Sequence, residues 1–253
     1  MPKFMDVSDT ETGNSLFNFD YTSVKVDRLG ATEYTAVTIV VDKTLSVSPF
    51  KKGLEDMIKT CVESCKKSPR ALNLLIRIIA FNSEGIEEIH GWMLLSDIKI
   101  DDYDDVIFPA NCTNLIDAAL NGLAVTHDYI TNLYNSERIC NANGMLFFIT
   151  DGDDNASKNP TENIKETIDK INQEEAMESL RTILIGVNDT NPYFQKRLET
   201  FRKEAGIDEY ISMGDVTDSK LAKLAQFMSQ SISAQSNSLG TGQPSQPISD
   251  YKF

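Results

Sequence analysis

The hydrophobic residues of this chain gather into a few continuous runs, separated by stretches with helical spacing. The runs at 35–42, 145–150 and 182–187 are nearly unbroken and rich in Val, Ile, Leu and Phe. Such runs are typical of strands that are buried on both faces of a mostly parallel sheet. We therefore predict that these three strands are central in the sheet.

The stretches between the runs alternate between helix and strand patterns. The further predicted strands are 71–81, 86–95 and 209–213, and the predicted helices are 50–67, 114–134, 160–179, 192–205 and 217–232. Strand alternating with helix predicts an α/β fold, a single doubly wound and mostly parallel sheet with helices on both faces. We expect strand 86–95 to be one antiparallel edge strand, because too few residues separate it from 71–81 for a crossover.

Three parts of the chain differ in composition. We predict an N-terminal extension over 1–32. Residues 1 to about 20 are polar and acidic, so we expect them to be poorly ordered, and 20–34 to add a strand or clasp. One domain occupies 33–232. Residues 233–253 are rich in Ser, Gln, Gly and Pro, so we expect a flexible tail that is dispensable for folding.

Composition and charge narrow the classes of function. The 253 residues, 41% of them hydrophobic, suffice for a full core, and the net charge of −14 argues against nucleic acid or anionic membrane as a partner. The sequence has neither an apolar run long enough to cross a bilayer nor the core of a signal peptide, so we expect a cytoplasmic location. The four cysteines lack the spacing of a zinc site, and Cys61 and Cys65 fit the core-facing side of a helix.

Oxygen-bearing side chains stand at the ends of predicted strands and at the start of a predicted helix. Asp42, Thr44 and Ser46 follow the first central strand, Thr113 precedes the helix at 114–134, and Asp151 follows the second central strand. The carboxyl ends of parallel strands lie at one edge of a sheet, where ligands bind in open α/β folds. Carboxylate and hydroxyl oxygens are ligands for hard cations. The sequence therefore predicts a cation site at this edge.

The three segments resemble, in their order, the von Willebrand factor A domain with its metal-ion-dependent adhesion site. In that family the first loop reads Asp-x-Ser-x-Ser, the second supplies a threonine before a helix, and the third supplies Asp-Gly after a hydrophobic strand. The corresponding segments here are DKTLS at 42–46, Thr113 and DG at 151–152. The resemblance covers about 33–232.

The resemblance implies a metal-dependent adaptor that is not an enzyme. Ser46, Thr113 and Thr44 would coordinate Mg²⁺ or Mn²⁺ directly, and Asp42 and Asp151 would bind it directly or through water. In the family, an acidic side chain of a partner protein takes an open position on the metal. We therefore expect protein partners that present Asp or Glu.

Several positions extend or depart from the family pattern. Thr44 replaces the usual serine, and Lys43 and Leu45 stand where small residues are common. We predict that Lys43 and Asp153 form the rim that contacts the partner. Within the family, the chain looks closest to cytoplasmic bacterial proteins of the tellurite-resistance and stress-response type, some of which end in a serine-rich stretch similar to 229–238.

Three other interpretations stay open. Asp42-Lys43-Thr44 also resembles the phosphorylated motif of P-type ATPases, which would make Asp42 the nucleophile of a haloacid-dehalogenase-like phosphatase with Mg²⁺ beside it. The following Gly-Thr of that motif is missing here. A second alternative is a structural A domain in a larger assembly, such as a phage particle, without metal dependence. The simplest interpretation treats these residues as ordinary caps and turn formers.

Overall fold

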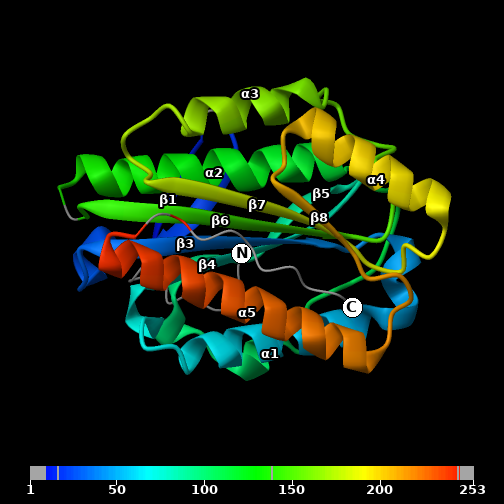
Figure 1. Cartoon of the computed structure of the whole chain (residues 1–253), viewed down its shortest axis with the longest axis horizontal. Coiled ribbons are helices and arrows are strands. Elements are labelled where there is room, and N and C mark those ends of the chain that lie inside the picture. The colour runs from blue at the N-terminus through cyan, green and yellow to red at the C-terminus, as the bar shows by residue number, and fades with distance from the viewer. Residues whose placement is uncertain (1–9, 16, 138, 244, 246–253) are drawn as a thin grey trace.

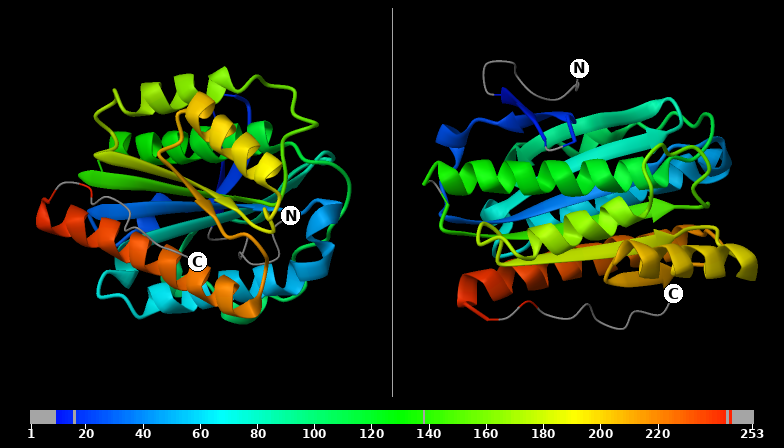
Figure 2. Two further views of the ribbon diagram at one scale, coloured as in Figure 1. Left: turned by 45° about the vertical axis from the view of Figure 1, so that its right-hand side comes forward. Right: turned by 90° about the horizontal axis from the view of Figure 1, so that it is seen from above.

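The computed structural model describes residues 10–15, 17–137, 139–243 and 245. In these residues a single eight-stranded sheet lies between two layers of helices (Figures 1 and 2). The strands are β1 (Thr10–Asn14), β2 (Asp20–Val24), β3 (Glu33–Asp42), β4 (Leu74–Asn82), β5 (Gly85–Leu94), β6 (Asn141–Thr150), β7 (Ser179–Gly186) and β8 (Glu209–Ser212). The α-helices are α1 (Lys51–Lys66), α2 (Leu115–Asn135), α3 (Glu162–Ile171), α4 (Pro192–Ala205) and α5 (Asp218–Thr241).

The sheet has the order β1-β2-β5-β4-β3-β6-β7-β8, with β3 near its middle. Strand β3 runs parallel to both neighbours, so that Val37 lies opposite Ile76 of β4 and Met145 of β6. Strands β6, β7 and β8 continue the parallel part, and β5 is antiparallel to β4. The predicted fold class and the central position of β3 and β6 are therefore confirmed, whereas β7 lies next to the edge strand β8.

The N-terminal extension adds two strands beyond β5, so β5 is not the edge strand that the sequence suggested. β1 and β2 form an antiparallel hairpin, and β2 pairs with β5 through Ser23 and Trp92. Gly91 permits this approach, because a Cβ atom there would lie 2.0 Å from the carbonyl oxygen of Thr22. Tyr21, Ser23 and Val24 are buried, which explains why this segment joins the sheet despite its weak hydrophobic pattern.

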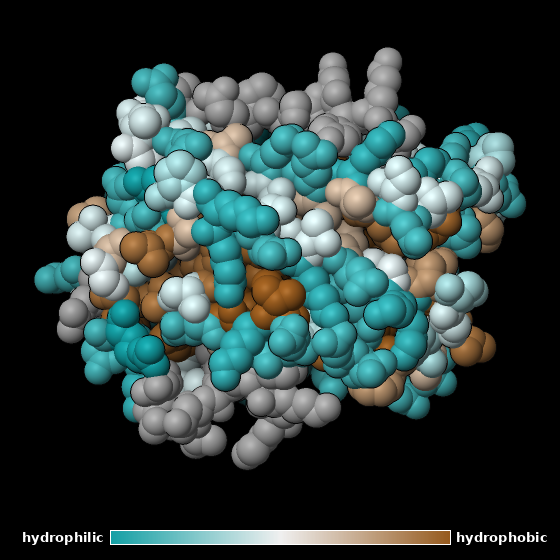
Figure 3. Space-filling view, turned by 90° about the horizontal axis from the view of Figure 1, so that it is seen from below, coloured by the Kyte–Doolittle hydropathy of each residue, from teal (hydrophilic) through white to brown (hydrophobic). Residues whose placement is uncertain are grey.

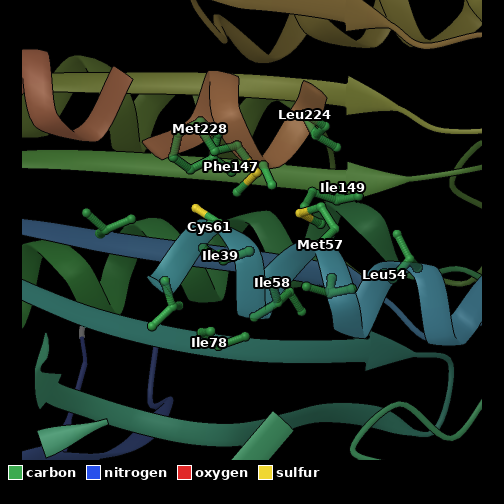
Figure 4. Packing of buried hydrophobic residues seen from close by; sticks show 14 of the residues in the cluster. Ile39, Leu54, Met57, Ile58, Cys61, Ile78, Phe147, Ile149, Leu224 and Met228 are labelled. Atoms are coloured by element: carbon green, nitrogen blue, oxygen red, sulfur yellow. The ribbon is translucent and has the colours of Figure 1, made fainter. Parts of the chain in front are cut away.

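Each face of the sheet has its own hydrophobic core. Because side chains alternate along a strand, Val37, Ile39 and Val41 of β3 face α1 and α5, whereas Ala36 and Val40 face the layer of α2, α3 and α4. Figure 4 shows the first core, in which Leu54 to Cys61 of α1 meet Ile39 of β3 and Phe147 of β6. Cys61 and Cys65 lie in this core, as predicted. The outer surface of this side is mostly hydrophilic, with hydrophobic areas showing between the charged side chains (Figure 3).

Two helices differ in length from their predictions. Helix α3 ends at Ile171, rather than near 179, because the polar residues 172–175 offer nothing to bury against the sheet. Helix α5 continues to Thr241, whereas the tail was expected to begin at 233. Its serine-rich end lies close to the sheet, with Gln235, Ser236 and Leu239 buried. Small side chains permit that close approach, so this part of the predicted tail belongs to the domain.

The two ends of the chain and the length of its helices bear on two further predictions. The disorder expected over 1–20 is wrong for Thr10–Asn14, which form β1. Residues 1–9 of that prediction and 246–253 of the predicted tail lie outside the described residues. In the part of the chain that is described, none of the helices is long and apolar enough to cross a membrane.

Candidate functional site

The last residue of β3, Asp42, anchors the first loop of the candidate site. Its carboxylate is completely buried, and both oxygens accept hydrogen bonds. Oδ1 accepts from the backbone N–H of Thr44 at 2.7 Å, and Oδ2 accepts from the hydroxyl of Thr150 at 2.7 Å. Asp42 therefore fixes the turn after β3 and ties it to the end of the adjacent strand β6.

The hydroxyls of Thr44 and Ser46 extend this arrangement towards the surface. Thr44 Oγ1 and Ser46 Oγ lie 2.9 Å apart, and Ser46 Oγ donates to Oδ1 of Asp151 at 2.8 Å. Ser46 belongs to a short 3₁₀ segment, Leu45–Phe50, which turns the chain from β3 into α1. The loops after β3 and β6 thus bring the hydroxyls of Thr44 and Ser46 and the carboxylate of Asp151 into one continuous series of hydrogen-bond contacts.

Thr113 reaches the site from the loop before α2. Asn155 clamps its backbone: the side-chain Oδ1 accepts from Thr113 N–H at 2.9 Å, and Asn155 N–H donates to Thr113 O at 3.0 Å. Asp154 accepts from the N–H of Ile116 in the first turn of α2 at 3.2 Å. Asp154 and Asn155 are not among the predicted site residues, although their position directly after the Asp-Gly-Asp of the third loop was the available signal.

An open hollow of about 580 Å³ lies in front of these loops. It is bounded by residues from the three loops and from the start of α4, among them Ser46, Thr113, Asp151, Asp153, Asn155 and Tyr193. Thr44 and Asp42 lie behind this wall. The structure therefore brings Ser46, Thr113 and Asp151 to one surface, with Thr44 and Asp42 supporting them from below.

Burial disfavours the charge of both carboxylates of the site, and Asp42 further disfavours the charge of Asp151. Burial raises the pKa of Asp42, against the hydrogen bonds from Thr44 and Thr150. Burial and then the neighbouring charge of Asp42 raise the pKa of Asp151 from 3.8 to about 6, while the hydrogen bond from Ser46 opposes that rise. A positive charge in the hollow would relieve both effects.

The two residues predicted for the rim have different surroundings. Asp153 lines the hollow, where it pairs with Arg197 of α4 at 2.5 Å. Lys43 instead points to the neighbouring strands, and its Nζ lies 2.6 Å from Glu87 of β5. Lys43 is not among the residues that line the hollow. The structure therefore brings Asp153 to the site but not Lys43.

The described residues contain no group of three or more His, Cys, Asp and Glu side chains placed to hold a metal. The candidate site differs from such a cluster because it combines two carboxylates with three hydroxyls. Any cation there would depend on Ser46, Thr44 and Thr113 as much as on the acids.

Comparisons with known proteins give the fold alone. No family model matches the chain, and no curated protein matches it. Among solved structures, the PilB minor pilin from Streptococcus sanguinis is 14% identical with a TM-score of 0.57, covering 87% of this chain and 66% of that one. The pilus adhesin SpaC from Lactobacillus rhamnosus GG is 10% identical with a TM-score of 0.57, covering 85% of this chain and 32% of that one.

A third similar structure comes from the mussel byssus. Proximal thread matrix protein 1, in a structure described as having a zinc-occupied MIDAS motif, is 16% identical with a TM-score of 0.50. The match covers 79% of this chain and 48% of that protein. The chain thus spans less than two thirds of each of these three proteins.

These findings correct the family assignment made from the motifs. That assignment pointed to cytoplasmic A-domain proteins of the tellurite-resistance and stress-response type and is wrong. No family model supports it, the similar folds belong to pilus and byssus proteins, and the described residues hold no cluster of metal-binding acids. The comparisons support the fold that this chain shares with those proteins and no family assignment.

Proposed function

We propose that this chain is a protein-binding module that holds a divalent cation, Mg²⁺ or Mn²⁺, at the hollow and captures an Asp or Glu side chain of a partner protein. The observation that carries the proposal is the 2.8 Å contact between Ser46 and Asp151, in a hollow that Thr113 also lines. Three oxygen donors from three separate loops converge there.

The donor set suits a hard cation. It offers hydroxyl and carboxylate oxygens, which Mg²⁺ and Mn²⁺ prefer over nitrogen and sulfur. In the described part of the chain, neither Asp42 nor Asp151 pairs with a lysine or arginine, and the pKa of each is raised. A bound cation would supply the missing positive charge and an open position for a carboxylate.

Each residue has a separate role in this proposal. Ser46, Thr113 and Asp151 line the hollow and would contact the cation, with Thr44 behind Ser46. Asp42 acts mainly as a positioning residue, because its two oxygens already hold Thr44 and Thr150. This arrangement keeps the loop in shape before anything binds, which lowers the cost of ordering it.

The similar structures agree with a binding role. One of them is described with a zinc-occupied MIDAS motif, and two are pilus proteins, one of which is called an adhesin. The phosphatase alternative has less support, because Asp42 is completely buried and uses both oxygens in hydrogen bonds. A nucleophile must reach its substrate, and this carboxylate does not face the hollow.

Isothermal titration of Mg²⁺ and of Mn²⁺ into the whole chain tests the cation. Ser46→Ala and Thr113→Val should each weaken binding at least tenfold, because each removes an oxygen from the hollow. Ser48→Ala is the matched control: Ser48 lies in the same 3₁₀ segment, but its hydroxyl donates to the carbonyl of Leu45. If wild type gave no heat of binding, or if all variants bound the cation with equal affinity, the proposal would be contradicted.

Pull-down experiments with and without a chelator test the capture of a partner. We expect at least one protein to be retained by wild type and by Ser48→Ala, and to be lost with the chelator or with Ser46→Ala. A partner retained equally under all these conditions would instead support a binding surface without metal dependence.

A further inference from the structure

A second hollow continues the first one along helix α4. Its volume is about 450 Å³, and Lys196, Arg197, Thr200 and Phe201 contribute to its wall. Asp153, Asp154 and Tyr193 line both hollows. The two therefore adjoin and form one groove, from Ser46 and Thr113 to the outer face of α4. We call this the α4 groove.

Helix α4 is a basic element in an acidic chain. It contains four basic and two acidic residues, a net charge of +2, whereas the whole chain has −14. Arg202 and Lys203 pair with Glu199 of the same helix. Lys196 is exposed and forms no ion pair with the described residues, which leaves its charge available to a ligand.

The carboxylates of the α4 groove are mostly engaged. Asp153 pairs with Arg197, and Asp154 accepts hydrogen bonds from Ile116 N–H and from Ser157. Glu204 stands at the far end, roughly 12 Å along the helix from Lys196. Among the described basic residues of the α4 groove, Lys196 is therefore the one without an ion-pair partner, because Arg197 pairs with Asp153. Asp151 also lacks a basic partner, and the cation of the proposed function would offset its charge.

Exposed aromatic rings stand at the same junction. Tyr193 is 62% exposed and Phe194 is 39% exposed, and their ring centroids lie 5.7 Å apart in an edge-to-face arrangement. Both rings line the first hollow, and Tyr193 also lines the second. Large exposed rings beside polar groups are typical of surfaces that bind protein segments.

We infer that the α4 groove binds an extended acidic segment of the partner protein. One acidic residue of the segment occupies the Ser46–Thr113–Asp151 hollow, a second acidic residue contacts Lys196, and the side chain between them packs on Tyr193. This inference rests on the proposed function for the first contact, whereas the second needs only Lys196. The acidic remainder of the chain repels such a segment, whereas Lys196 and the cation of the proposed function attract it to this groove.

A display library of random linear peptides, selected on the whole chain in the presence of Mg²⁺, tests the inference. The selected peptides should carry two acidic residues at a fixed separation with an apolar or aromatic residue between them. The affinity of one selected peptide is then measured by fluorescence anisotropy. Lys196→Gln should weaken it roughly three- to tenfold, the size usual for one partly exposed ion pair, and added salt should reduce this difference.

Two controls separate the contacts. Lys203→Gln lies on the same helix but pairs with Glu199, so it should leave the affinity unchanged. A peptide with serine in place of its second acidic residue should bind wild type and Lys196→Gln equally. Selection of peptides with one acidic residue, of basic peptides or of no peptide, or equal affinity of wild type and Lys196→Gln, would overturn the inference.

The outcome also distinguishes the two proposals. If the chelator and Ser46→Ala leave peptide binding unchanged while Lys196→Gln weakens it, the metal-dependent function fails and the role of Lys196 stands. If the chelator abolishes binding but Lys196→Gln has no effect, the metal-dependent function stands and the acidic contact at Lys196 is wrong.

Discussion

Ser46 and Asp151 are 105 residues apart in the chain, yet the serine hydroxyl lies 2.8 Å from a carboxylate oxygen of the aspartate. The contact follows from topology, because β3 and β6 are adjacent parallel strands whose carboxyl ends must meet. Without a cation, the hydroxyl donates to a carboxylate that burial and Asp42 make costly to ionise. The site therefore holds its shape at the expense of some stability at neutral pH.

The first prediction concerns Asp151→Asn in the presence of a chelator. The pKa of Asp151 is raised to about 6 in the folded chain from an ordinary value of 3.8. The unfolded chain therefore loses this proton first, and stability falls as the pH rises from about 4 to about 6. Discounted for partial exposure, the cost at pH 7.5 is about 1–2 kcal/mol, which the variant should regain.

Chemical denaturation at several pH values measures this effect. The advantage of Asp151→Asn should shrink as the pH falls towards 4 and vanish below the ordinary pKa of 3.8, where the wild-type carboxyl is protonated in both states. With a saturating cation at pH 7.5 the order should reverse, because binding stabilises only the wild type. A variant that is less stable than wild type at pH 7.5 with chelator would contradict the raised pKa.

Much of this fold could be predicted from hydrophobic patterns, since buried parallel strands such as β3 and β6 are continuous apolar runs. The proximity of Asp42, Ser46 and Asp151 could be predicted as well, because the carboxyl ends of parallel strands lie at the same edge of the sheet. The direction of Lys43 could not be predicted, as it depends on Glu87 of a strand beyond the neighbouring one. The spacing of residues along the chain does not show which distant side chain a residue contacts.

The serine-rich end of α5 escaped prediction for a different reason. Composition suggested a flexible tail after 233, but Ser236 is buried and Asn143 donates to the carbonyl of Gln235 at 3.1 Å. Small polar residues can pack closely when another element supplies their hydrogen bonds. The predicted cytoplasmic location is not addressed by any of these contacts and stays a prediction.

The second prediction is that Asn155→Ala weakens cation binding by roughly ten- to hundredfold without unfolding the chain. Asn155→Ala removes the side-chain acceptor of the Thr113 N–H and keeps the backbone N–H that donates to Thr113 O, so it loosens the loop that carries the Thr113 hydroxyl. Titration of Mn²⁺ measures the change. Thr190→Ala, another exposed position that lines the same hollow, is the control and should bind as wild type does. Equal affinity in both variants would mean that Thr113 needs no clamp.

The third prediction concerns the end of helix α5. A chain that ends at Ala234 should lose about 2–3 kcal/mol of stability, because it exposes surface now covered by Leu239 and removes the acceptor for Asn143. A chain that ends at Ser245 keeps every described residue and is the reference. Denaturant unfolding of both gives the difference. Equal stability would show that residues after 234 are dispensable, as their composition alone suggested.

The last prediction tests the buried ion pair that joins the N-terminal hairpin to the sheet. Arg77 of β4 is fully buried, and its Nε lies 2.8 Å from Oε1 of Glu88 in β5. The other oxygen of Glu88 accepts from the N–H of Thr22 at 3.0 Å and from its hydroxyl at 2.9 Å. The pair therefore connects β4 with the hairpin through β5, and Glu88 is its central member.

Arg77→Met should cost about 3–5 kcal/mol, because it leaves the charge of Glu88 without its partner in a largely buried place. Adding Glu88→Gln to that variant should recover much of the loss, since a neutral amide oxygen still accepts from Thr22. Denaturant unfolding of wild type, both single variants and the double variant measures the coupling. If the double variant is no more stable than Arg77→Met, the loss comes from the cavity and the broken contact with Asn121, which accepts from Arg77 at 3.0 Å, and not from the unpaired charge.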